Sequence, residues 1–202
     1  MNRKQIIGIG IILVLVIWII TSYNSLVDSE ILVEQNWGNV TTRYQERADK
    51  IDQLVKVVKG SANFEKSTLT EITEARASVG KVELKADQIT PENLEKFEAA
   101  QNRLKGTFDR LMVVVEKYPE LKTTENFGKL QDEVAGMENR IATARTDFNA
   151  AVASYNSRVR RFPSNIFANL FDFQKKEMFK NQEGTENRPD IDFSDKPASS
   201  NP

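Results

Sequence analysis

An unbroken apolar run near the N-terminus constrains this chain more than any other feature. Residues 6–20 contain no charged side chain, and as a helix extended to Tyr23 the run is ~27 Å long at ~1.5 Å per residue. The hydrocarbon core of a bilayer is about 30 Å thick, so the run predicts a transmembrane anchor over residues 6–23. Trp18 and Tyr23 lie where interfacial aromatic residues are expected.

The alternative to an anchor is a cleaved signal peptide, which needs small residues ahead of its cleavage site. Residues 21–25 read Thr-Ser-Tyr-Asn-Ser and lack an Ala-x-Ala pattern. A lipoprotein anchor needs a cysteine, and the chain contains none. The run therefore favours an uncleaved, single-pass anchor.

The charges that flank the run predict its orientation. Arg3 and Lys4 precede it, whereas the next basic residue is Arg43. The positive-inside rule then places residues 1–5 in the cytoplasm and the rest of the chain on the extracytoplasmic side. This inference rests on two cations against none.

Composition removes several classes of function. Lys and Arg total 28 and Asp and Glu 29, and this even balance argues against nucleic acid as a partner. The absence of Cys and His removes thiol nucleophiles, histidine bases and the usual zinc ligands. Glutamate pairs spaced three apart, such as Glu71 and Glu74, lack the histidines of di-iron bundles and are expected on solvated faces. No catalytic residue, cofactor or metal site is expected, and the chain is not predicted to be an enzyme.

Beyond the run, apolar residues recur at helical spacing. The first such stripe comprises Val33, Trp37, Val40, Tyr44, Ala48, Ile51, Val55 and Val58. A break is expected at residues 60–63, because a single helix over residues 25–80 would be about 84 Å long and would leave much of its apolar face uncovered. Thr90 and Pro91 mark the start of a third helix, and Thr123 or Thr124 opens a fourth. The predicted fold is all-α: the transmembrane helix followed by an antiparallel four-helix bundle of long helices over residues 24–160.

The amino-acid composition changes after the last predicted helix. Residues 161–180 are basic and rich in Phe, whereas residues 181–202 are polar and contain three prolines, which predicts a disordered tail. An up-down bundle returns residues 158–180 to the membrane, where cations and aromatic groups can contact lipid. The candidate lipid contacts are Arg158, Arg160, Arg161, Phe167, Phe171, Lys175 and Lys176. The alternative is that these Phe residues close the open end of the bundle.

Three arginines lie on or beside the apolar stripes and are candidates for structural buried charge: Arg76, Arg140 and Arg145. A buried arginine needs an acidic partner, because an isolated charge is costly in a medium of low dielectric constant. The candidate partners are Glu74, Glu133 and Glu138. Such a network would set the helix register; the alternative is a partner-binding notch.

Several motifs in this chain are similar to those of one known family. They are residues 23–27 (YNSLV), Trp37, residues 44–49 (YQERAD), 58–60 (VKG), 73–76 (TEAR), 116–122 (EKYPELK), 138–142 (ENRIA) and 162–163 (FP). Together they resemble the LemA family over about residues 23–173. The departures are small, among them Glu46 in place of a usual basic residue and Asp52-Gln53 in place of Pro-Asn.

The resemblance implies a bacterial inner-membrane protein with a LemA-like four-helix bundle and without an established biochemical activity. Family members are described as neighbours of membrane-protease and envelope-stress components. Our first hypothesis is a non-enzymatic, membrane-anchored scaffold or adaptor whose bundle binds a protein partner. The alternative is a membrane-organising protein that acts by homo-oligomerisation and by lipid contact of residues 158–180.

Overall fold

The computed structural model describes residues 2–60, 65–82, 84–122 and 124–180. All regular structure within these ranges is helical, which confirms the predicted all-α class. The tail expected over residues 181–202 lies outside the described residues.

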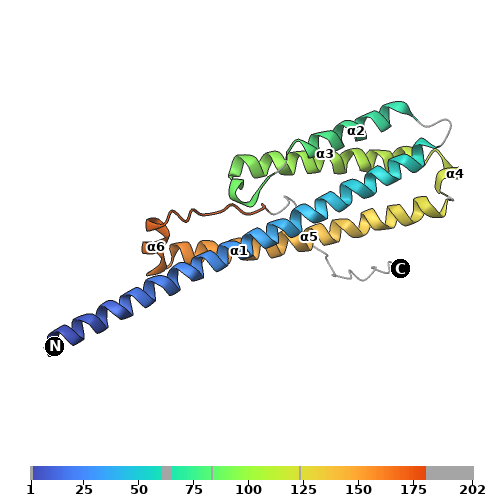
Figure 1. Ribbon diagram of the computed structural model, residues 1–202. Helices are drawn as coiled ribbons and strands as arrows, with labels where there is room; N and C mark the ends of the chain where they lie inside the picture. The colour runs from blue at the N-terminus through green and yellow to red at the C-terminus, as the bar shows by residue number, and fades with distance from the viewer. Residues whose placement is uncertain (1, 61–64, 83, 123, 181–202) are drawn as a thin grey trace, which may run out of the picture.

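Four long helices form the body of the molecule (Figure 1): α1 (Arg3–Lys59), α2 (Lys66–Gly80), α3 (Pro91–Val115) and α5 (Glu125–Arg160). Three short elements connect or follow them: a 3₁₀ turn η1 (Ala86–Gln88), α4 (Pro119–Lys122) and α6 (Ser164–Leu170). Helices α1 and α5 lie side by side, and the α2–α3 hairpin packs against one flank of this pair (Figure 1).

Helix α1 joins the apolar N-terminal section to the bundle without a break. Its 57 residues correspond to ~85 Å at ~1.5 Å per residue. Among the described residues, α1 alone is long and apolar enough to cross a membrane, and none of its most apolar 18-residue window is buried in the protein. These properties are compatible with a membrane anchor. The helix ends at Lys59, where the sequence predicts a break.

Local signals explain where the later helices begin. The Thr90 hydroxyl accepts a hydrogen bond from the Asn93 backbone N–H at 3.2 Å, and Pro91 occupies the first helical position. Thr124 precedes α5, as predicted. The single turn of α4 was not predicted; it begins at Pro119, in the link to α5.

The helices that pack against α1 differ in length, so the composition of the core changes along α1. Helix α2 has 15 residues and α5 has 36, so they are ~22 and ~54 Å long at ~1.5 Å per residue. The α2–α3 hairpin therefore covers only the part of α1 and α5 distant from the apolar section. The core of this distal part is formed by residues such as Ile51, Leu54, Ile72, Leu104, Leu111 and Phe127.

The middle section of the core is aromatic. The Trp37 ring lies 5.3 Å from the rings of both Phe97 and Phe148, between centroids. Its indole N–H donates to the Leu84 carbonyl at 2.7 Å, and this bond ties the α2–α3 connection to α1. Tyr44, the other aromatic residue of the first predicted stripe, is also buried, as is Tyr155 of α5.

Candidate functional site

The C-terminal part of the chain covers the end of the bundle that adjoins the apolar section of α1, where α5 ends (Figure 1). A cis Phe162–Pro163 peptide bond joins α5 to α6. After α6 the chain turns at Asp172, whose φ of 59° lies in the left-handed region that Asp tolerates better than most residues. Residues 173–180, here called the strap, then run back along α1 and α5 without regular secondary structure.

Two asparagines of α5 bind the backbone of the strap. The side-chain amide of Asn156 donates to the Lys176 carbonyl at 2.8 Å and accepts from the Lys176 N–H at 3.0 Å. Asn149 binds both backbone groups of Phe179 in the same way, at 3.0 and 2.9 Å. Because the asparagines are seven residues apart, they lie on one face of α5, about two turns from each other.

Two further α5 side chains complete this row of contacts. The Tyr155 hydroxyl donates to the Gln174 carbonyl at 2.9 Å. An Arg145 guanidinium nitrogen donates to the Lys180 carbonyl at 3.2 Å. Side chains of α5 thus hold the strap through its backbone at four residues, and the Phe173 N–H donates to the Ala168 carbonyl of α6 at 2.9 Å.

Phe179 is the deepest side chain of the strap and is only 4% exposed. Its ring stacks on Trp37 at 5.9 Å and meets Phe148 edge-on at 5.5 Å. The guanidinium carbon of Arg145 lies 4.4 Å from the ring centroid, within the range of a cation–π contact. Phe179 therefore completes the aromatic section of the core.

Lys176 occupies a second, electrostatic pocket. Its ammonium lies 2.9 Å from the Glu30 carboxylate on α1, and the lysine side chain is 11% exposed. The same ammonium lies 5.6 Å from the centroid of the Tyr155 ring. Three residues earlier, Phe173 is partly buried and meets the Tyr23 ring at 5.8 Å. Phe173, Lys176 and Phe179, every third residue of the strap, thus face the surface between α1 and α5, here called the groove.

Burial controls the ionisation of the two core tyrosines. Removal from water raises the pKa of Tyr155, and the nearby Glu30 carboxylate raises it further. Burial also raises the pKa of Tyr44, although the cations of Arg145 and Arg47 oppose this effect. Tyr155 is therefore protonated at neutral pH and able to donate its hydrogen bond to the strap.

Below the strap, α6 packs beside the outer end of the apolar section of α1. Phe167 lies 5.0 Å from Trp18, and Phe171 lies 4.9 Å from Tyr23, between ring centroids. The outer side of this region is apolar and open to solvent: Phe162, Ile166 and Leu170 are all exposed.

The seven candidate lipid contacts differ in their exposure to solvent. Exposed side chains are found at Arg158, Arg160, Arg161, Phe171 and Lys175, and Arg158 donates to the Ser25 carbonyl at 3.1 Å. Phe167 and Lys176 are corrected: Phe167 is buried beside Trp18 and Leu26, and Lys176 is paired with Glu30. Both face the protein, because the chain turns back at Asp172 and lays the strap along the bundle.

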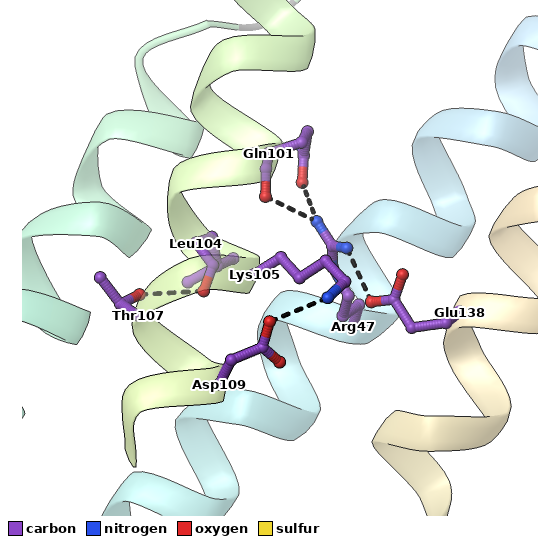
Figure 2. Close-up of polar contacts among 7 residues, drawn as sticks. All are labelled: Arg47, Gln101, Leu104, Lys105, Thr107, Asp109 and Glu138. Atoms are coloured by element: carbon purple, nitrogen blue, oxygen red, sulfur yellow. Dashed lines mark hydrogen bonds and ion pairs between the residues drawn. The ribbon is translucent and has the colours of Figure 1, made fainter. Parts of the chain in front are cut away.

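The most buried charge belongs to Arg47 of α1, whose side chain is 3% exposed. Figure 2 shows it pointing between α3 and α5. One guanidinium nitrogen donates to Glu138 at 2.9 Å, and another donates to the Gln101 side-chain and backbone oxygens at 2.9 and 3.1 Å. This cluster connects three helices, and sequence reasoning missed Arg47. Its position between Tyr44 and Ile51 on the apolar stripe was the available signal.

The three arginines predicted to be buried differ in their surroundings. Arg145 is partly buried and pairs with Glu98 at 2.7 Å. Arg76 is corrected, because its side chain is 42% exposed and pairs with Asp49 at 3.3 Å. Arg140 is also corrected, because it is exposed on α5. The partners differ as well: Glu138 pairs with Arg47, Glu133 with Lys50 and Glu74 with Arg103.

A cleft of about 330 Å³ opens beside Phe179, between α3 and α5. Four cations line it, and three of them have acidic partners: Arg47 has Glu138, Arg145 has Glu98, and Lys105 has Asp109 at 2.9 Å (Figure 2). The fourth cation is Lys180, at the end of the strap. No acidic cluster able to hold a metal ion occurs in the part of the chain that the structure describes.

Comparison with known proteins gives the chain its family. The sequence model of the LemA family matches residues 36–193, which is most of the chain. Protein LemA of Metamycoplasma hominis is 26% identical over 137 residues, 67% of this chain and 58% of that protein. Magnetosome proteins MamQ 1 and MamQ 2 of Paramagnetospirillum magneticum are 38% identical over 71 residues, 35% of this chain and 26% of each relative. This chain thus spans less than two thirds of the length of these relatives, yet the family match covers most of its own residues, and the chain belongs to the LemA family.

Proposed function

We propose that this LemA-family protein is a non-enzymatic scaffold, anchored in a bacterial inner membrane, whose bundle binds a protein partner on the extracytoplasmic side. The observation that carries the proposal is the continuity of α1 from Arg3 to Lys59. A single helix supplies both the apolar section and one wall of the bundle core. The bundle is therefore held in a set orientation and at a set height above the anchor, as presentation of a binding surface requires.

The test is site-specific photo-crosslinking in cells. A photoreactive amino acid is placed at one of three exposed positions on different helices: Ala77, Asn102 or Asn139. The expected result is an adduct with one discrete protein from one face of the bundle. If only adducts between copies of the chain appear from all faces, the scaffold proposal is wrong.

A matched pair of insertions tests the role of the continuous helix. Seven flexible Gly and Ser residues after Tyr23 should abolish the adduct, because the bundle then loses its orientation relative to the anchor. Seven helix-forming Ala, Glu and Lys residues at the same place add the same number of residues and keep α1 continuous. This control should retain more of the adduct than the flexible insertion.

A second candidate function is membrane organisation through self-association and lipid contact. It is favoured by the exposed apolar surface of Phe162, Ile166 and Leu170, beside Arg160 and Arg161. Ile166 and Leu170 are four residues apart and share one face of α6. The ring of Phe167 contacts Trp18, so α6 lies next to the apolar section of α1. Such a basic and apolar surface fits the bilayer interface.

Depth-dependent quenching tests the lipid contact. The chain has no native cysteine, so Leu170→Cys provides a single site for a fluorophore in full-length protein reconstituted in anionic nanodiscs. Brominated lipids should quench this label more strongly than a label at Ala77→Cys on α2. Equal quenching at the two sites would contradict insertion of α6.

A further inference from the structure

The strap is bound in the way that a receptor binds a foreign extended peptide. Among the described residues, all hydrogen bonds to the backbone of residues 174–180 come from side chains of α5. The segment forms no strand pairing and no helix. Its conformation is thus determined by the groove, and its backbone contacts do not depend on its own side chains.

We propose that the groove between α1 and α5 is a peptide-binding site for extended segments of the pattern aromatic-x-x-cation-x-x-aromatic. The strap, with Phe173, Lys176 and Phe179, is its ligand within the chain. A partner's extended segment of the same pattern is its ligand in trans and displaces the strap. This inference rests on the proposed scaffold function, because it assigns the surface and the chemistry through which the scaffold recognises its partner.

The geometry explains both the affinity and the specificity of such a site. The paired hydrogen bonds of Asn149 and Asn156 satisfy the N–H and the carbonyl of any residue that lies opposite them. Specificity then comes from the pockets. Glu30 selects a cation at the central position, as it does for Lys176 at 2.9 Å. The ring of Trp37, stacked on Phe179, selects an aromatic group at the last position.

The other strap residues are exposed and do not contribute to specificity, which depends on the positions of Phe173, Lys176 and Phe179. Gln174, Lys175, Glu177 and Met178 are exposed. Because the strap is tethered directly to α6, its effective concentration at the groove is on the order of millimolar. A free peptide at lower concentration competes poorly with it. A partner anchored in the same membrane gains a similar advantage, so recognition in trans favours membrane-bound partners.

The experiment uses the full-length chain in nanodiscs and a fluorescent synthetic peptide of residues 172–180 as the probe. Lys176→Glu with Phe179→Ala in the chain weakens the strap and frees the groove. This variant should bind the peptide with an anisotropy change, whereas the wild-type chain should bind about 100-fold more weakly if its groove is open for about 1% of the time. Binding of equal strength to both chains would overturn the proposal.

Charge reversal separates groove binding from general adhesion. Glu30→Lys, added to a chain freed by Lys176→Ala with Phe179→Ala so that its own strap cannot pair with the new lysine, should abolish binding of the wild-type peptide and create binding of a peptide that carries Lys176→Glu. Asn149→Ala in the freed chain should weaken both peptides. If the freed chain keeps its helical circular dichroism and fails to bind the peptide, the proposal is overturned. It is also overturned if Glu30→Lys leaves the binding of both peptides unchanged.

A second measurement applies even if the freed chain does not fold. A spin label at Met178→Cys in an otherwise wild-type chain reports release of the strap as increased mobility. Excess unlabelled wild-type peptide should increase that mobility, and the Lys176→Glu peptide should not. Equal effects of the two peptides overturn the inference. If photo-crosslinking from Asn102 or Asn139 gives a protein adduct but the groove does not bind the peptide, the inference about the groove is wrong and the proposed scaffold function remains supported.

Discussion

Asn149 of α5 forms a closed pair of hydrogen bonds with the backbone of Phe179: its amide nitrogen donates to the carbonyl at 3.0 Å and its amide oxygen accepts from the N–H at 2.9 Å. The pair sets the register of the strap, because a shift by one residue would remove Phe179 from the rings of Trp37 and Phe148. One polar side chain on α5 thus positions an aromatic member of the core.

Asn149→Ala should lower the free energy of unfolding by about 1–3 kcal/mol, because two partly buried backbone groups lose their partner. The measurement is chemical denaturation of the full-length chain in detergent, followed by circular dichroism. Asn139→Ala, at an exposed position of the same helix, is the control and should have little effect. Similar losses for the two variants would show that Asn149 does not hold the strap.

Arg47→Ala should destabilise the protein by about 1–3 kcal/mol, the usual cost of leaving a buried polar group unsatisfied, because its ion-pair partner Glu138 is 38% exposed and can be hydrated. The substitution removes the guanidinium that donates a hydrogen bond to the buried Gln101 side-chain oxygen. Arg43→Ala removes a solvent-exposed pair with Glu46 and should cost less than about 1 kcal/mol.

Joint replacement of Arg47 and Gln101 by leucine should cost less than Arg47→Ala alone, because no polar group of this pair is then left unsatisfied in the core. The Arg47 Nε is buried without a hydrogen-bond partner among the described residues, so the native cluster is itself incompletely satisfied. Denaturation midpoints of the variants give the comparison. A double variant less stable than Arg47→Ala would contradict this account of the cluster.

The stability of the protein should decrease as the pH rises above about 10, because Tyr155 keeps its proton in the folded chain and loses it in the unfolded chain. Its raised pKa comes from burial and from Glu30. The unfolded state then binds fewer protons than the folded state, and the equilibrium moves toward unfolding. Tyr155→Phe removes this titration.

The measurement is the unfolding free energy of wild type and Tyr155→Phe at about pH 9 and about pH 11, on either side of the ordinary tyrosine pKa. The variant is less stable at the lower pH, since it lacks the hydrogen bond to Gln174, but it should lose less stability between the two values. Parallel losses would assign the pH dependence to other groups.

The bundle should be accessible from the extracytoplasmic side, as the positive-inside rule predicts from Arg3 and Lys4. A single Ala77→Cys on α2 is exposed in a chain without native cysteine. A membrane-impermeant maleimide should label it while the inner membrane is sealed. Labelling only after the membrane is opened would reverse the orientation and move the search for partners to the cytoplasm.

The helices were predictable because their signals are local. Thr90 and Pro91 specify a helix start through capping and a preset backbone angle. Residues such as Trp37 and Tyr44 lie on a stripe of helical period and are buried as predicted. Neither kind of signal depends on another segment of the chain, so both can be read from the sequence.

The burial of charge was not predictable in the same way. Arg47 and Arg140 both lie on or beside apolar stripes, yet Arg47 is buried and Arg140 is exposed. Periodicity gives the face of a helix on which a residue lies, whereas its depth depends on whether another helix covers that face. Only the packing of α3 and α5 against α1 brings Gln101 and Glu138 to Arg47.

The path of the C-terminal segment shows the same limit more sharply. Phe173, Lys176 and Phe179 follow a period of three, which matches neither an α-helix nor a strand. Composition alone left open whether the basic and aromatic residues of this segment contact lipid or close the end of the bundle. The sequence by itself determined the apolar section, the helix boundaries and the core stripes, because these depend on near neighbours in the chain. The tertiary structure alone decided that the strap returns to the groove, because its partners Glu30, Trp37 and Asn149 are distant in sequence and meet only when α1 and α5 pack together.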